Sequence, residues 1–414
     1  MIKKHFIQNI FLAILLFICA DVFSQNIWNK RASIGGSKRE RGIGFSIGTR
    51  GYMGLGQDTL NLMINDFWEY DPGTNSWTQK ANFPGAARRD AVGFSIGTKG
   101  YVGTGIDNAD SFLGLIYADF WEYNPGTNVW TAKANYPGNF GNGVYFATGF
   151  SILNKGYICG GKVGPANILD ELWEFTPSTN SWLQKANYPA GNRYGGVAFT
   201  IGNYGYFGTG TDEAVLNTNF YKYDPIANTW TAIANFPSSA RFSCSAFSIS
   251  GKGYMMFGTD GGYKDELWQY DPAYNFWFPK ASIPGGARRA SIAFSIGGKG
   301  YAGTGKGPTG TRKDFWEYLP SITVGMDEHT EDVFVSVYPN PIIENATIQI
   351  SEQIYNADKN LFYDIINLQG KIIQSEKMTA STVNINASNY SKGIYFIAIR
   401  SFETKIASKK IILQ

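Results

Sequence analysis

One motif recurs six times along the chain, and this repeat restricts the possible folds more than any other feature. The unit reads Gly-Phe-Ser-Ile-Gly and then Gly-Tyr-x-Gly-x-Gly, with small variations between copies. The copies occupy residues 44–56, 93–105, 149–161, 198–210, 246–258 and 293–305. A period of roughly 50 residues is typical of repeat architectures in which each unit is one supersecondary element.

A second motif follows each copy of the first. Complete versions occupy residues 67–77, 120–130, 172–182, 220–230 and 267–277, and a sixth, at 315–321, stops early. In every complete version an aromatic residue precedes a tryptophan by a fixed interval, as Tyr70 precedes Trp77. Tyr318 of the short version has no tryptophan after it, and Trp28 near the start of the chain has no tyrosine before it.

The local chemistry of both motifs indicates β-strands. Short runs of aromatic and β-branched residues are bounded by glycine, and Gly-Thr-Lys or Gly-Gly-Lys suits a tight hairpin turn. Asp-Pro-Gly-Thr-Asn is also turn chemistry. Each unit therefore predicts four antiparallel strands, and six such units predict an all-β, six-bladed β-propeller. We expect the strand around Trp28 to complete the sixth blade and close the ring.

The unit resembles the kelch repeat, which has a hydrophobic strand, glycines, and a Tyr and Trp separated by six residues. The resemblance covers roughly residues 26–321, although only Gly160-Gly161 keep the diglycine that usually ends the second strand. It implies a six-bladed kelch propeller over residues 25–321. Kelch propellers include binding proteins and a few sugar-acting enzymes, so the fold alone does not settle the function.

The first 24 residues have the order of a secretory signal peptide. Two lysines precede an apolar stretch over residues 10–20, which is shorter than the ~20 residues needed to span a bilayer, and small residues follow it. We expect cleavage after residue 24 and no transmembrane span in the mature chain. The mature chain keeps Cys159 and Cys244, predicted to be free and buried in different blades, and one histidine, His329.

Composition changes after the propeller. Residues 322–332 are rich in acids and predict a linker, whereas residues 333–414 contain five to seven short alternating runs that predict a small immunoglobulin-like β-sandwich. This segment resembles the C-terminal sorting domain of the type IX secretion system of Bacteroidetes (type A). The matching residues are Tyr338-Pro-Asn-Pro341, Gly370-Lys371, Gly393-Ile-Tyr-Phe396 and the terminal Lys-Lys-Ile-Ile. The resemblance implies contact with that machinery, export across both membranes, and secretion or outer-membrane-associated surface display.

Two charged positions recur in the propeller. Six residues before the repeat phenylalanine lie Arg39, Arg88, Arg193, Arg241 and Arg288, with Val144 in the remaining unit. Just before the second motif lie Asp66, Asp119, Glu171, Glu266 and Asp314, with Asn219 as the exception. One interpretation is that the two rings pair and tie the blades together. The other is that part of the arginine ring faces the channel mouth and binds an anionic group, since a guanidinium matches a carboxylate bidentately.

The remaining composition excludes several function classes. A net charge of +3 without a basic stripe argues against nucleic-acid binding. The predicted propeller contains no histidine, so we expect no His-ligated metal, no Ser-His-Asp triad and no cofactor. The loops between the second and third strands vary in length, and variable loops on a rigid scaffold favour binding. The sequence thus predicts an exported protein that binds a carbohydrate or a protein without catalysis. The alternative is a sugar-modifying enzyme of the epimerase or mutarotase type, using carboxylates and arginines in the channel.

Overall fold

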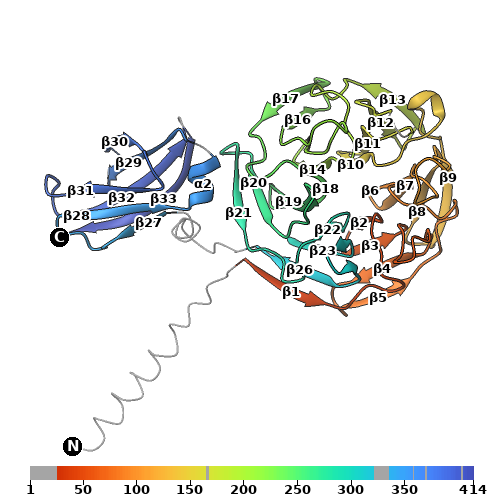
Figure 1. Cartoon of the computed structure of the whole chain (residues 1–414), viewed down its shortest axis with the longest axis horizontal. Helices are drawn as coiled ribbons and strands as arrows, with labels where there is room; N and C mark the ends of the chain where they lie inside the picture. The colour runs from red at the N-terminus through yellow and green to blue at the C-terminus, as the bar shows by residue number, and fades with distance from the viewer. Residues whose placement is uncertain (1–25, 165–166, 321–334, 358, 369–370, 402–403) are drawn as a thin grey trace, which may run out of the picture.

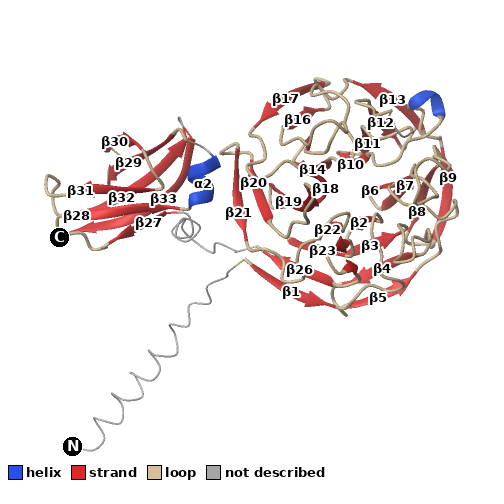
Figure 2. Ribbon diagram, in the orientation of Figure 1, coloured by secondary structure: helices blue, strands red, loops and turns tan. Residues whose placement is uncertain are grey.

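The computed structural model describes residues 26–164, 167–320, 335–357, 359–368, 371–401 and 404–414. It consists of a closed ring of four-stranded sheets followed by a second β domain (Figure 1). Figure 2 shows that strands and loops make up almost all of both parts. The all-β prediction is confirmed. The predicted signal peptide and the linker at 322–332 lie outside the described residues.

Five blades are each continuous in sequence, and their strands are antiparallel neighbours in chain order. The first blade is β2 (Ile43–Ile47), β3 (Arg50–Gly54), β4 (Phe67–Asp71) and β5 (Ser76–Gln79). The second is β6 (Val92–Ile96), β7 (Lys99–Gly103), β8 (Phe120–Asn124) and β9 (Val129–Lys133). The third is β10 (Thr148–Ile152), β11 (Lys155–Cys159), β12 (Leu172–Thr176) and β13 (Ser181–Lys185). The fourth is β14 (Val197–Ile201), β15 (Tyr204–Gly208), β16 (Phe220–Asp224) and β17 (Thr229–Ile233). The fifth is β18 (Phe242–Ile249), β19 (Lys252–Thr259), β20 (Leu267–Asp271) and β21 (Phe276–Lys280).

The sixth blade joins the two ends of the propeller. Its inner strands are β22 (Ile292–Ile296), β23 (Lys299–Gly303) and β26 (Phe315–Leu319), and its outer strand is β1 (Ile27–Arg31). Trp28 lies opposite Tyr318 in the antiparallel register of β1 and β26. The predicted closure through the Trp28 strand is confirmed. The loop between β23 and β26 contains a small hairpin of two-residue strands, β24 (Lys306–Gly307) and β25 (Gly310–Thr311).

The repeat glycines and phenylalanines meet between neighbouring blades. A Cβ added to Gly51 of the first blade would lie 2.4 Å from the ring of Phe294 in the sixth, and one added to Gly100 would lie 2.6 Å from the ring of Phe45. The same contact recurs around the ring at Gly156, Gly205, Gly253 and Gly300. The glycine of each Gly-Tyr motif is therefore needed because the phenylalanine of the preceding blade fills the space of its side chain.

The repeat tryptophans connect blades by hydrogen bonds. The Trp77 indole donates to the carbonyl of Ala32, the residue after β1, at 3.1 Å. Equivalent bonds of 2.8 to 3.1 Å occur at Trp28, Trp130, Trp182, Trp230 and Trp277. Each outer strand is thus attached to the chain segment that follows the preceding blade. The Tyr and Trp spacing in the sequence reflects this contact.

The C-terminal domain is a two-sheet sandwich, as predicted. One sheet contains β27 (Val335–Tyr338), β28 (Asn345–Ile350) and β31 (Thr382–Asn386). The other contains β29 (Leu361–Asn367), β30 (Ile372–Lys377), β32 (Gly393–Ser401) and β33 (Thr404–Leu413). A short helix, α2 (Glu352–Ala357), follows β28. The buried side chains of Ile348, Ile365 and Ile397 belong to the hydrophobic core of the sandwich.

Candidate binding site at the channel mouth

The inner strands of all six blades surround a central channel with a volume of about 170 Å³. Small residues line much of it, including Gly44, Gly93, Gly149, Ala198, Ala246 and Ala293. Gly44, Gly93 and Gly149 each face the β-branched side chain of the neighbouring inner strand, which leaves no room for a Cβ. The lining hydroxyls of Thr148, Ser245 and Ser291 donate to backbone carbonyls. The wall therefore offers few polar groups to a ligand, and we expect a binding site among the side chains at the end of the channel.

A closed ring of backbone hydrogen bonds encircles one end of this channel. One residue from each blade, four positions before the repeat phenylalanine, donates its N–H to the carbonyl of the equivalent residue in the preceding blade, at 2.8 to 3.0 Å. The six residues are Arg41, Asp90, Phe146, Gly195, Ser243 and Ala290, and all have a φ between 51° and 60°. The left-handed backbone turns each N–H and C=O along the circumference of the ring. We call these six residues and the residue before each of them the mouth.

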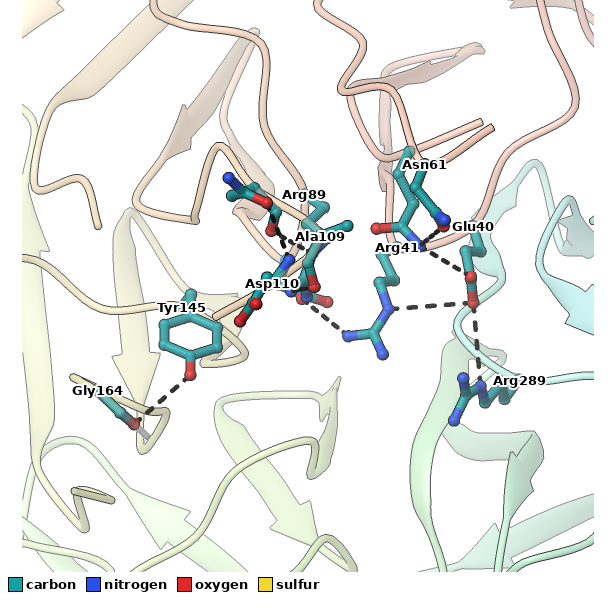
Figure 3. A network of polar contacts seen from close by, with 12 residues as sticks. Glu40, Arg41, Asn61, Arg89, Ala109, Asp110, Tyr145, Gly164 and Arg289 are labelled. Carbon is teal, nitrogen blue, oxygen red and sulfur yellow. Dashed lines mark hydrogen bonds and ion pairs between the residues drawn. The ribbon is translucent and has the colours of Figure 1, made fainter. Parts of the chain in front are cut away.

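One half of the mouth is charged. Arg41 donates to Asp90 at 2.9 Å, and Arg89 also pairs with Asp90. Glu40 is buried, with Arg41 and Arg289 at 4.0 and 3.9 Å and the Lys306 ammonium at 3.8 Å. Figure 3 shows the Glu40 carboxylate between the guanidiniums of Arg41 and Arg289. The sixth, first and second blades therefore supply alternating positive and negative groups.

The other half of the mouth is aromatic. Phe146, Tyr194 and Phe242, from the third, fourth and fifth blades, form a cluster with ring centroids 5.6 to 6.5 Å apart. All three are partly exposed. The Arg41 guanidinium lies 4.6 Å from the centre of the Phe146 ring, a cation–π distance. Arg41 therefore joins the charged half to the aromatic half.

The loops between the second and third strands of each blade form the wall around the mouth. Backbone bridges connect Glu40 to Gln57, Arg89 to Ile106, Tyr145 to Lys162 and Tyr194 to Thr211. The Lys162 ammonium lies 4.8 Å from the Tyr194 ring and pairs with Glu213 of the next blade's loop. The loops that vary most in sequence are thus fixed against the mouth by backbone contacts.

The five arginines predicted from the sequence lie one position deeper than the mouth. Their exposed fractions are between 0% and 2%, and four of them form ion pairs with the recurring acids. The pairs are Arg39–Asp66, Arg88–Asp119, Arg241–Glu266 and Arg288–Asp314. Each of these acids also accepts from the indole of the tryptophan two residues later. This geometry favours the pairing interpretation in four blades, and direct ligand contact by the arginines stays a prediction.

The third and fourth blades each hold half of a pair. Glu171 accepts from the Trp173 indole at 2.8 Å, but Val144 occupies the arginine position of its blade. Arg193 has Asn219 at the acid position, and its Nε and Nη1 atoms have no hydrogen-bond partner among the described residues. Burial lowers the pKa of the Arg193 guanidinium below its usual value.

The mouth residues were not among those predicted from the sequence. They follow the arginine position directly, and in the six copies they read Glu-Arg, Arg-Asp, Tyr-Phe, Tyr-Gly, Phe-Ser and Arg-Ala. The sequence feature that could have indicated them is the pair of variable positions between the recurring arginine and the strand that follows it. Their inward direction depends on the left-handed turn, which the side chains do not encode.

In the described parts of the chain, Cys159 and Cys244 are free thiols, as predicted, and Cys159 is buried. Cys244 is only half-buried as a residue, because it lines the channel. No group of three or more metal-ligating side chains occurs among the residues that the structure covers. In these same ranges, no helix has the length and apolar character to cross a bilayer.

Comparisons with known proteins bear on both domains. Residues 336–414 match the family of secretion system C-terminal sorting domains. A solved structure titled "Structure of YjhT" superposes with a TM-score of 0.60 at 18% identity, over 69% of this chain and 95% of that one. No curated protein matches the sequence. The chain is therefore a six-bladed β-propeller that shares its fold with that structure, joined to a C-terminal sorting domain that marks it for export by the type IX secretion system to the cell surface or the medium.

Proposed function

We propose that the mouth of the propeller binds a carbohydrate outside the cell. The observation that carries this proposal is the partly exposed cluster of Phe146, Tyr194 and Phe242 beside the Arg41 and Asp90 pair. Binding sites for small molecules are mostly apolar or aromatic, with a few fixed polar groups that set orientation. The mouth combines both within one rigid ring of backbone hydrogen bonds.

The chemistry of the two halves suits a sugar. Aromatic rings offer flat apolar faces against which the C–H faces of a pyranose pack. A guanidinium donates hydrogen bonds, and the partly exposed Arg41, which the buried Asp90 holds in place, offers donors to sugar hydroxyls. These groups are held in place before the ligand arrives, which lowers the entropy cost of binding.

The test is a glycan array with the mature full-length protein, followed by titration of any sugar that binds. Phe146→Ala is expected to weaken binding by about tenfold, which corresponds to ~1.4 kcal/mol of lost contact. Ile226→Ala is the control, because Ile226 is 85% exposed in the turn between β16 and β17, at the other end of the strands. Equal affinities for Phe146→Ala and the control protein would contradict a sugar site at the mouth.

A protein ligand is the second candidate. The loops of the first two blades expose five large apolar side chains, namely Leu60, Leu62, Phe112, Leu113 and Leu115, and exposed apolar patches often mark protein interfaces. An absence of array binding combined with capture of an extracellular protein, lost in Phe112→Ser, would favour this candidate.

Catalysis is the third. Glu40 is buried, and its Oε2 atom has no hydrogen-bond partner among the described residues although three cations surround it. A turnover assay on each bound sugar separates the alternatives. Chemical change in the sugar, lost in Glu40→Gln, would replace the binding proposal with a sugar-modifying enzyme.

A further inference from the structure

The outer strand of the fifth blade departs from the repeat. In the first four blades the residues on either side of the outer-strand tryptophan are exposed, and in each of these blades at least one of the two is Ser or Thr. In β21 both neighbours of Trp277 are phenylalanine. Nothing in the propeller architecture requires this change, because the other blades close without it.

The C-terminal domain covers this surface. Phe278 is 6% exposed and belongs to the same buried cluster as Ile348 and Ile365 of the sorting domain. Phe276 packs against that cluster, and its ring centroid lies 5.1 Å from that of Phe278. In Figure 1, β21 forms the side of the ring that faces the C-terminal domain.

The covering extends to neighbouring groups of the same blade. Trp277 is 2% exposed, whereas the equivalent Trp77, Trp130, Trp182 and Trp230 are only half-buried. Burial lowers the pKa of Lys280, at the end of β21, to about 8. The Tyr274 ring lies 6.3 Å from Phe278 and extends the apolar surface beyond the strand.

We propose that Tyr274, Phe276 and Phe278 form a docking surface for the sorting domain of the same chain. The domain then rests against the fifth blade in a fixed orientation, rather than being held only by the connecting segment. Removal of the sorting domain after export would uncover the surface. This inference is independent of the ligand proposal, because the surface lies on the rim of the ring and the mouth lies on its axis.

The test uses small-angle X-ray scattering of the mature full-length protein. We expect the unmodified protein to scatter as one compact particle, and F276S/F278T to show a larger radius of gyration and maximum dimension. The variant copies Ser76 and Thr78 of the first blade, so the strand tolerates it. Leu183→Thr, at the position of Phe278 in the third blade and 58% exposed, is the matched control and is expected to change nothing.

Hydrogen exchange supplies a second measurement that does not depend on the variant. In the unmodified protein, amides of β21 are expected to exchange at least about tenfold more slowly than those of β13. An extended scattering profile of the unmodified protein would overturn the proposal. Identical profiles for the unmodified protein and F276S/F278T, or equal exchange in β21 and β13, would overturn it as well.

Discussion

Four blades of the propeller contain a buried Arg–acid pair, whereas the third and fourth blades each contain one half of it. The fourth retains Arg193 opposite Asn219, and the third retains Glu171 opposite Val144. The backbone ring continues unbroken through both blades, from Asp90 to Phe146 to Gly195. The pairs are therefore not what closes the ring. Within each of the four blades, the acid neutralises the charge of the arginine that is buried below the mouth.

The contrast also follows the chemistry of the mouth. The sixth, first and second blades have complete pairs and carry the charged half, and the third and fourth carry much of the aromatic half. Burying a charged side chain costs free energy because the charge loses its hydration. An oppositely charged partner offsets this cost, and a buried charge without a partner destabilises the folded protein. Arg193 is thus the one arginine of the five that is buried without an ion pair among the described residues.

The largest effect is expected when the second blade is converted to the pattern of the fourth. Asp119→Asn leaves Arg88 buried without its carboxylate, and we expect the free energy of unfolding to fall by about 2–4 kcal/mol. The estimate lies below the loss for a fully buried pair because the Asp119 side chain is 27% exposed. Urea unfolding followed by tryptophan fluorescence measures it. A loss below about 0.5 kcal/mol would mean that the pairs do not matter for stability.

A smaller effect of opposite sign is expected when the fourth blade is given its missing partner. Asn219→Asp places a carboxylate at the position where the other blades pair it with arginine, and we expect a gain of about 1–2 kcal/mol. Pairing lowers the pKa of the new carboxyl in the folded state, so the gain is present near neutral pH and is lost as the pH falls through that pKa. Thermal unfolding at pH 7 and pH 3 checks both parts. Destabilisation at pH 7 would show that the surroundings of Arg193 do not accept a carboxylate.

The smallest effect is expected at the other half-pair. Glu171→Gln removes a charge that forms no ion pair among the described residues and keeps an oxygen that accepts from Trp173. We expect a change within about 0.5 kcal/mol in the same urea experiment. A loss comparable to that of Asp119→Asn would mean that the acid ring stabilises the blades without arginine.

Much of the fold was predictable because the repeat determines it locally. Six copies of strand and turn chemistry indicated the blades, and the unmatched Trp28 and Tyr318 indicated which strands close the ring. The recurring arginines and acids were also found by alignment of the copies. The burial of the arginines was not predictable, since five arginines that each precede a strand fit either a channel lining or a set of buried ion pairs.

The sequence by itself determined the architecture, the closure and the export route, because each rests on patterns that repeat or on a contiguous C-terminal segment. Only the tertiary structure decided which residues face the axis. Arg41, Phe146 and their equivalents are brought together from blades far apart in sequence, and their direction is set by the left-handed turn of a ring of hydrogen bonds that exists only when all six blades are in place.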